Sequence, residues 1–264
     1  MRIPLFHVDA FAEEPFGGNP AAVCLLDSWL DDEQLRKVAA ENSLSATAFL
    51  VRKGRAYDLR WFTPRCEIRL CGHATLASAY VLFAALKTGD EQLEFHTRFS
   101  GSLFVRKEGE LFGMDFPALP PEPCRDVPIR VARAIGTPEQ PTELLEVNDI
   151  LIAVFANQRT VQELFPDFAL LEELHPRTVA VTAPGENADF VSRYFAPTYG
   201  VPEDPVTGSA HCALTAYWTK RLSKTVLHAQ QLSERGGTLL CEQKGNRVFV
   251  KGRAVLTLRG TLVL

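Results

Sequence analysis

The amino-acid sequence predicts an α+β protein of two similar lobes, each with a β-sheet or barrel wrapped around one central α-helix. Three observations support this fold class. Landmarks of the first half recur in order in the second half, a proline-rich segment separates the halves, and each half has one alanine-rich apolar segment among short β-rich ones. We place the N-terminal lobe at residues 1–117 and the C-terminal lobe at 118–253, and the final strand, 254–264, can return to the first lobe.

The internal repeat is clearest around two glycines. The matching segments are Arg60-Trp61-Phe62-Thr63-Pro64 with Cys71-Gly72-His73-Ala74, and Arg193-Tyr194-Phe195-Ala196-Pro197 with Thr207-Gly208-Ser209-Ala210. A further glycine follows each helix glycine by the same 29 residues, from Gly72 to Gly101 and from Gly208 to Gly237. Strand, glycine turn and alanine-rich helix recur in any α/β protein, which is the alternative explanation. The shared spacing favours duplication.

Each predicted element has a local reason. Strands are expected where β-rich segments are bounded by turn residues, in the first half at Pro4–Ala10, Ala21–Leu26, Ala46–Val51, Tyr57–Phe62, Gly101–Arg106 and Leu111–Phe116. Asp31-Asp32-Glu33 starts a helix that runs to about Glu41, because carboxylates favour the positive end of the helix dipole. Residues 117–123 hold four prolines in seven positions, so they form a linker and not a helix or a central strand.

The two alanine-rich helices begin near Gly72 and Gly208 and extend to about Lys87 and Leu222. They are apolar on nearly all sides, which predicts that strands surround them.

Composition narrows the function class. A net charge of −4 without a run of Lys and Arg argues against nucleic acid and anionic membranes as partners, and favours a small molecule. The longest apolar run, Leu76 to Leu86, is well short of the roughly 20 residues of a membrane span, and the N-terminus lacks a signal-peptide layout, so a cytoplasmic location is expected. Six cysteines at irregular spacings predict free thiols and no structural metal.

Two helix starts are the candidate chemical sites. Residues 199–210 are dense in turn formers immediately before a buried helix, and Cys71-Gly72-His73 offers the same arrangement in the other half. The N–H groups and dipole of a helix N-terminus can hold a substrate carboxylate or an enolate-like charge. If the halves pack with approximate two-fold symmetry, these ends face one another across a cleft, which is where we expect the active site.

Proton transfer on a substrate held there requires a group to take a proton and a group to return one. The candidates are His73, Asp204, Cys71 and, less directly, Glu203. Each has a structural alternative: Asp204 can be a turn or capping residue, His73 a satisfied polar group and Cys71 a small core residue. The residues His211 and Cys212 are interpreted as packing residues, and the loop 16–20 can simply be a tight turn.

The order of motifs resembles the phenazine biosynthesis-like (PhzF-like) isomerase family over nearly the whole chain. The matching segments are Val8-Asp9-Ala10-Phe11, Pro15-Phe16-Gly17-Gly18-Asn19-Pro20-Ala21-Ala22-Val23, Phe62-Thr63-Pro64, Cys71-Gly72-His73-Ala74-Thr75, Glu203-Asp204-Pro205-Val206-Thr207-Gly208-Ser209-Ala210 and Gln231-Leu232-Ser233-Glu234-Arg235-Gly236-Gly237. The resemblance implies the diaminopimelate-epimerase-like fold, no metal or organic cofactor, a small carboxylate substrate (an amino or hydroxy acid) and a homodimer.

The resemblance also implies roles for individual residues. His73, Asp204 and Ser209 correspond to substrate-contacting and proton-handling residues, and Gly72 and Gly208 to backbone anion donors. Asn19 and Thr207 complete the expected substrate-binding set.

The family's principal acid/base is a glutamate in a motif reading Asn-Leu-Ser-Glu-Thr, and the corresponding segment here is Ser43-Leu44-Ser45-Ala46-Thr47. The methyl group of Ala46 cannot transfer a proton, and losing such a group commonly lowers a rate by roughly 10² to 10⁴. Three readings follow: an engineered variant, a natural enzyme with another base, or a non-catalytic small-acid-binding or interaction module. For the second, related epimerases carry a cysteine before each helix glycine, where this chain has Cys71 and Thr207. One thiol opposite one hydroxyl suggests one-sided proton abstraction by Cys71, as in a dehydratase or tautomerase.

Overall fold

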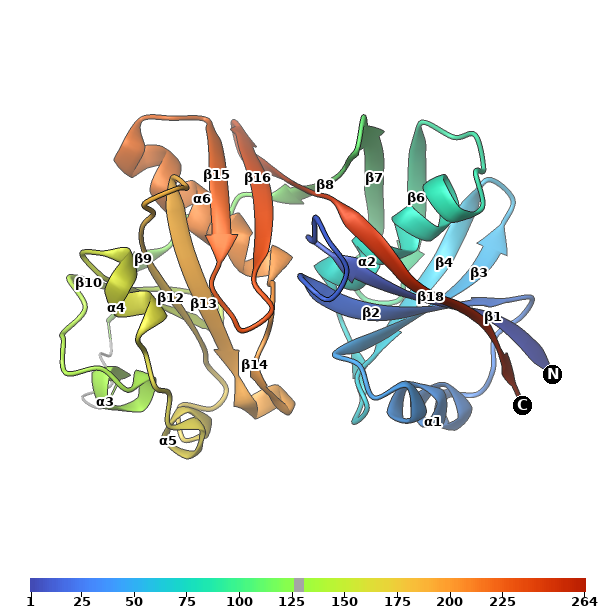
Figure 1. The fold of residues 1–264 in the computed structure, drawn as a ribbon, viewed down its shortest axis with the longest axis horizontal. Helices are drawn as coiled ribbons and strands as arrows, with labels where there is room; N and C mark the ends of the chain where they lie inside the picture. The colour runs from blue at the N-terminus through green and yellow to red at the C-terminus, as the bar shows by residue number, and fades with distance from the viewer. Residues whose placement is uncertain (126–130) are drawn as a thin grey trace. The chain divides into compact units, whose positions relative to one another are not determined.

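The computed structural model describes residues 1–125 and 131–264, which divide into two compact units (Figure 1). Unit 1 comprises Met1–Asp115 with Lys251–Leu264, and unit 2 comprises Phe116–Val250. None of the helices in these described ranges has the length and hydrophobicity that crossing a membrane demands.

Unit 1 is built from strands around one buried helix. Its elements are β1 (Arg2–Ala10), β2 (Asn19–Leu26), α1 (Asp32–Asn42), β3 (Ala46–Lys53), β4 (Ala56–Phe62), β5 (Glu67–Ile68), α2 (Gly72–Tyr80), the π-helical turn η1 (Val81–Ala85), β6 (Gln92–Thr97), β7 (Ser102–Glu108), β8 (Leu111–Pro117) and β18 (Ala254–Val263). The C-terminal strand β18 pairs antiparallel with β1 along its whole length. Both ends of the chain therefore belong to this unit.

Unit 2 repeats the pattern with more short helices. Its elements are β9 (Glu122–Pro123), α3 (Val131–Ile135), β10 (Glu143–Val147), β11 (Ile150–Val154), α4 (Gln158–Gln162), α5 (Phe168–Glu172), β12 (Thr178–Pro184), β13 (Phe190–Ala196), the 3-10 turn η2 (Pro197–Tyr199), β14 (Val201–Glu203), α6 (Gly208–Leu222), β15 (Val226–Gln231), β16 (Gly237–Lys244) and β17 (Arg247–Gly252). The two-residue strand β9 pairs only with β10 among the described residues, which is compatible with its proline because an edge strand needs fewer N–H donors.

The strands of the two units pair in the same order of directions. In unit 1, β2 and β3 are parallel, β3 and β4 antiparallel, β4 and β6 parallel, and β6 and β7 antiparallel. In unit 2, β11 and β12, β12 and β13, β13 and β15, and β15 and β16 follow the same sequence of directions. The crossover from β4 to β6 contains α2, and that from β13 to β15 contains α6. The repeat predicted from the two helix glycines is therefore present in the topology.

The central helices are buried, as their apolar composition predicts. Helix α2 packs against β1, β2 and β3, and all of its residues except Tyr80 are buried. Helix α6 lies against β15 and β16 (Figure 1). Each unit has a further apolar cluster. In unit 1 it lies between α1 and β3 and includes Leu35, Val38 and Phe49, and in unit 2 it includes Leu151 and Val181.

The first central helix is shorter than the sequence predicts. Regular α-helix ends at Tyr80, and the next turn is π-helical, with the Leu86 N–H donating to the Val81 carbonyl. The wider turn accommodates an extra residue, and Lys87 then adopts a left-handed conformation (φ 52°) that stops the helix. The helical segment thus ends at Ala85, two residues before the predicted Lys87, and its last turn is π-helical. Helix α6 ends at Leu222 as predicted, with Ser223 in the left-handed cap.

Candidate functional site

The loop between β1 and β2 is held by a buried carboxylate. Asp9 Oδ2 accepts a hydrogen bond from the Phe16 N–H at 2.7 Å, and Asp9 is only 3% exposed. The loop requires glycine at position 18: its φ is +61°, and a Cβ there would lie 2.2 Å from the Ala10 carbonyl oxygen. This tight turn brings Asn19, which is fully buried, to the start of β2.

Ser45 lies beside Asn19 because two parallel strands begin together. Helix α1 ends at Asn42, and Ser43 in the left-handed conformation turns the chain into β3. In the parallel pairing of β2 and β3, Ala46 stands opposite Ala21. The Ser45 Oγ consequently reaches Asn19 Oδ1 at 2.7 Å and the Pro20 carbonyl oxygen at 2.8 Å.

The same hydroxyl contacts His73, at 3.1 Å from its Nε2. Ser45 has one proton, and the Asn19 and Pro20 oxygens can only accept, so that proton goes to one of them. We therefore assign the proton between Ser45 and His73 to Nε2 of the imidazole. The Nδ1 atom of the neutral ring is then a hydrogen-bond acceptor.

Cys71 lies beside the ring. Its Sγ is 3.5 Å from His73 Nδ1 and 3.8 Å from Nε2, and with Nε2 protonated the thiol can donate only to Nδ1. Burial lowers the pKa of His73 from 6.5 to about 3, because the charged imidazolium loses its solvation. Burial therefore favours the neutral imidazole of His73 in the resting protein, which leaves Nδ1 able to accept a hydrogen bond from the thiol.

Ala46 follows Ser45 directly and is fully buried. The structure thus gathers Asn19, Cys71, Gly72 and His73 within unit 1, with Ala46 next in the chain to the hydroxyl that contacts His73. A proton-transferring side chain at position 46 would start from a buried backbone position in the same group of residues.

In unit 2, a second polar group precedes α6. The Thr207 Oγ donates to Asp204 Oδ2 at 2.5 Å, and the Thr207 N–H donates to Gln231 Oε1 at 2.9 Å. Gln231 Nε2 donates in turn to the Asp204 carbonyl oxygen at 2.6 Å. This closed network fixes the loop from Asp204 to Thr207, so the turn-residue reading of Asp204 and a chemical role are both compatible with it. Gly208 and the half-buried Ser209 open the helix directly afterwards.

In the described part of the chain, neither helix start is capped by a side chain. Among the described residues, the side chain of neither N-cap, Cys71 nor Thr207, makes a capping hydrogen bond. Neither helix has an acidic residue in its first turn. The first N–H groups and the positive end of each dipole can therefore be directed at a ligand carboxylate.

Other candidates have different roles. The Glu203 carboxylate is engaged by both Nε and Nη2 of Arg193, at 2.8 and 2.9 Å, so it is held as half of an ion pair. His211 Nδ1 lies 2.8 Å from the Thr207 carbonyl oxygen, and burial lowers the pKa of this histidine to about 4. Burial raises the pKa of the Cys212 thiol to about 12, in accord with a packing residue. In residues 1–125 and 131–264, no group of three or more His, Cys, Asp or Glu is arranged to hold a metal ion.

Two residues of the candidate site were not identified from the sequence. Ser45 and Gln231 both lie inside motifs that the sequence comparison used, but neither carries an obvious chemical signal. Their importance comes from contacts with residues 24 to 28 positions away along the chain. A shallow pocket of about 360 Å³ borders Gln231 and Ser233 in unit 2.

Comparisons with known proteins agree with this organisation. The family model described as phenazine biosynthesis-like protein matches residues 8–260. The chain is 52% identical over 264 residues to a protein of Pseudomonas aeruginosa described as an uncharacterised isomerase, with all of both chains covered. The crystal structure of a phenazine biosynthesis protein of the PhzF family from Enterococcus faecalis is 46% identical, with all of both chains covered and a TM-score of 0.95.

A more distant structure extends the likeness at the level of the fold. A hydroxyproline epimerase from Agrobacterium vitis is 11% identical, with a TM-score of 0.61 over 99% of this chain and 92% of that one. This likeness confirms the fold predicted from the sequence.

Proposed function

Since the chain belongs to the phenazine biosynthesis-like family, we propose that it has the site of a cofactor-independent isomerase that moves a proton on a small carboxylate-bearing amino or hydroxy acid. Ala46 stands at the position of that family's acid/base glutamate. In this proposal the chain binds and orients the substrate with its own groups, and full turnover requires a proton-transferring side chain at position 46.

The observation that carries the proposal is the contact between Ser45 Oγ and His73 Nε2, at 3.1 Å, beside Ala46. A buried histidine with one nitrogen fixed as a donor and the other as an acceptor suits proton handling, because its orientation and tautomer are set before the substrate binds. Ser45 and Cys71 supply one partner for each ring nitrogen of His73, and Asn19 holds Ser45 in place.

A carboxylate group on the substrate is supported by the helix starts. The amides of Gly72 and Gly208 open α2 and α6, and the N-cap side chains leave these amides available. An isomerisation removes a proton from one carbon and returns it to another, so negative charge develops on the substrate in between. Backbone donors aimed at that charge stabilise the transition state without reorganising. We assign proton handling to His73 and Asp204, and substrate contact to Asn19, Thr207 and Ser209.

Solvent deuterium incorporation tests the proposal. A panel of small amino and hydroxy carboxylic acids is incubated in D2O with the chain as given and with Ala46→Glu, and carbon-bound deuterium is followed by NMR. Exchange only with Ala46→Glu is expected and would identify a disabled isomerase. Ala46→Gln is the matched control, since its amide has the size of glutamate but cannot act as a base. Binding of panel members without exchange in either protein would contradict the proposal and favour a binding module.

A dehydratase or tautomerase that uses Cys71 as its base is the second candidate. The Sγ to Nδ1 distance of 3.5 Å favours it, because His73 can align the thiol. Because burial disfavours the imidazolium form of His73, the thiol proton must be lost to solvent before Cys71 can take a proton from the substrate. Exchange in the chain as given, abolished by Cys71→Ser, would support this candidate. Retained exchange in Cys71→Ser would remove it.

We further propose that the protein acts as a homodimer. Light scattering coupled to size exclusion gives the mass directly, to be compared with 29.3 kDa for one chain.

A further inference from the structure

Each unit contains one arginine–glutamate pair with the same two-pronged geometry. Arg60 donates through Nε and Nη2 to the two carboxylate oxygens of Glu67, both at 2.7 Å, and Arg193 does the same to Glu203 at 2.8 and 2.9 Å. Both arginine side chains are 11% exposed. Bidentate pairs shielded from solvent are more rigid than exposed single contacts. We call them the two Arg–Glu clamps.

The clamps occupy equivalent points of the duplicated topology. Glu67 stands opposite Phe62 where β4 pairs with β5, and Glu203 stands opposite Phe195 where β13 pairs with β14. Each guanidinium also lies over the ring of that phenylalanine, with 5.1 Å from the guanidinium carbon to the ring centroid in both units. The phenylalanine face and the carboxylate together fix the plane of the arginine.

What the two clamps share most closely is their distance from the helix start. Gly72 is the fifth residue after Glu67, and Gly208 is the fifth residue after Glu203. The spacing from arginine to glutamate, in contrast, is 7 residues in unit 1 and 10 in unit 2. The loop before the glutamate has therefore changed length while the segment after it has not, which points to a constraint on the segment that leads into the helix.

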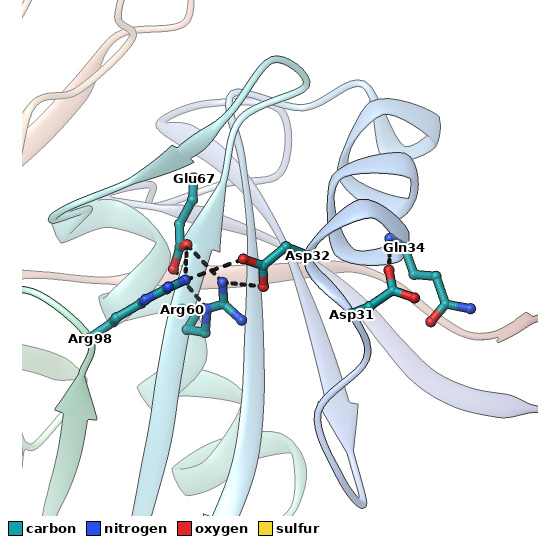
Figure 2. Close-up of polar contacts among 6 residues, drawn as sticks. All are labelled: Asp31, Asp32, Gln34, Arg60, Glu67 and Arg98. Atoms are coloured by element: carbon teal, nitrogen blue, oxygen red, sulfur yellow. Dashed lines mark hydrogen bonds and ion pairs between the residues drawn. The ribbon is translucent and has the colours of Figure 1, made fainter.

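The two arginines have different further partners, so only the clamp itself is common to both units. In unit 1, Arg98 joins Glu67 at 2.9 Å, and both arginines reach Asp32 at the start of α1 (Figure 2). In unit 2, Arg193 instead donates to the carbonyl oxygens of Leu164 and Val161. Each clamp thus ties its loop to a different neighbouring element of its own unit.

We propose that Glu67 and Glu203 are positioning residues, which hold the segments entering α2 and α6 so that the amides of Gly72 and Gly208 point at the ligand. The inference rests on the proposed function insofar as those amides bind a carboxylate. Neither glutamate touches the substrate in this account. Each acts through its arginine and the five residues that follow it.

Native-state amide hydrogen exchange tests the proposal on Glu67→Gln and Glu203→Gln, because neutral glutamine weakens the clamp with little change of size. Residues 68–74 should exchange at least tenfold faster in Glu67→Gln, residues 204–210 should do so in Glu203→Gln, and the Gly72 or Gly208 amide resonance should shift. The matched controls are Glu33→Gln and Glu163→Gln, which remove a carboxylate from exposed pairs with Lys37 and Arg159. Both controls should leave these segments unchanged.

No local change would overturn the proposal, and so would a rise confined to the amides that exchange through global unfolding of the unit, because that is the effect of a clamp that adds only global stability. Should a glutamine variant fail to fold, Arg60→Lys and Arg193→Lys keep the charge but lose the fork, and the same local effect is expected. The measurement needs no turnover. A negative result therefore counts against positioning even if isomerase activity is found, and missing activity counts against the proposed function alone.

Discussion

Ser45 and His73 fix one another's protons. The hydroxyl lies 3.1 Å from Nε2 and already has two carbonyl-type acceptors, so the imidazole must be the donor in this contact. The opposite nitrogen is thereby left as an acceptor toward Cys71. Ser45 has no acid/base group of its own, but its contact with Nε2 determines which ring nitrogen of His73 can accept a proton.

Replacing Ser45 with alanine should allow His73 to populate both neutral tautomers. We expect the nitrogen-15 shifts of the His73 ring to move from a pure Nε2–H pattern to a mixture of both tautomers, with a loss of about 1 kcal/mol in the free energy of unfolding for one hydrogen bond. NMR of histidine-labelled protein and urea unfolding provide the measurements. Ser78→Ala is the control, because Ser78 lies in the same helix as His73, is buried, and donates its hydroxyl proton to the Ala74 carbonyl oxygen at 2.7 Å. An unchanged ring spectrum in Ser45→Ala would refute the assignment.

Acid should destabilise the protein well before its carboxylates titrate. Burial lowers the pKa of His73 to about 3 and that of His211 to about 4, from 6.5. The unfolded chain therefore binds protons that the folded chain does not, and stability falls as the pH drops below about 6.5. Each histidine contributes a slope of about 1.4 kcal/mol per pH unit in that window.

The histidine contribution can be isolated at His211. Urea unfolding between pH 7 and pH 4.5, values chosen around the ordinary histidine pKa of roughly 6.5, should show a flatter pH dependence in His211→Gln than in the parent. His96→Gln provides the comparison, since that side chain is 48% exposed on β6. Parallel curves for His211→Gln and the parent would show that His211 does not resist protonation in the folded state.

Replacing Gly18 with alanine should lower the free energy of unfolding more than the same change at Gly54, which has the same backbone conformation. Gly18 and Gly54 have φ of +61° and +62°, but a Cβ at Gly54 meets nothing within 4 Å, whereas one at Gly18 lies 2.2 Å from the Ala10 carbonyl oxygen. Gly54→Ala should cost about 1 kcal/mol from the left-handed conformation alone. Gly18→Ala should cost about 2 kcal/mol more, through the clash. Equal losses in urea unfolding would mean that the loop relaxes freely.

The fold was predictable because its signal is repeated. Two glycines that open apolar helices, each followed by a second glycine at the same distance, indicate two copies of one unit, and strand pairing repeats accordingly. The apolar run predicts the end of the first helix to within two residues, but it does not reveal the change at Val81 from α-helical to π-helical hydrogen bonding. An apolar sequence pattern indicates that a helix is buried, but it does not indicate which carbonyl each N–H group bonds to.

The site was predictable only where residue type signals chemistry. His73, Cys71 and Asp204 are conspicuous in any sequence, whereas Ser45 and Gln231 matter through their long-range partners. The Arg–Glu clamps illustrate the same limit. Arg60 and Arg193 stand at matching places in the repeat, but their glutamates follow at 7 and 10 residues, so a comparison by fixed spacing does not pair them.

Introducing a carboxylate at Ala46 should lower stability in a pH-dependent way. Ala46 is fully buried, and burial raises the pKa of a carboxyl group because the charged form loses solvation. The folded Ala46→Glu protein should then bind a proton that the unfolded chain has already released. Its stability relative to the parent should fall as the pH rises above about 4.3, by about 1.4 kcal/mol per pH unit, until the raised pKa of the folded state is passed.

Ala46→Gln separates this electrostatic effect from the effect of size, since its amide occupies similar space and does not titrate. Urea unfolding of both variants from pH 4 to pH 8, a range that spans a carboxyl pKa raised from roughly 4.3, should give a difference that grows with pH and then levels off. The pH of levelling is the pKa of the new carboxyl in the folded protein, and a value near neutrality is what a general acid/base needs. A constant difference would mean that water or a cation solvates the carboxylate at position 46, and would count against an acid/base role for a glutamate there.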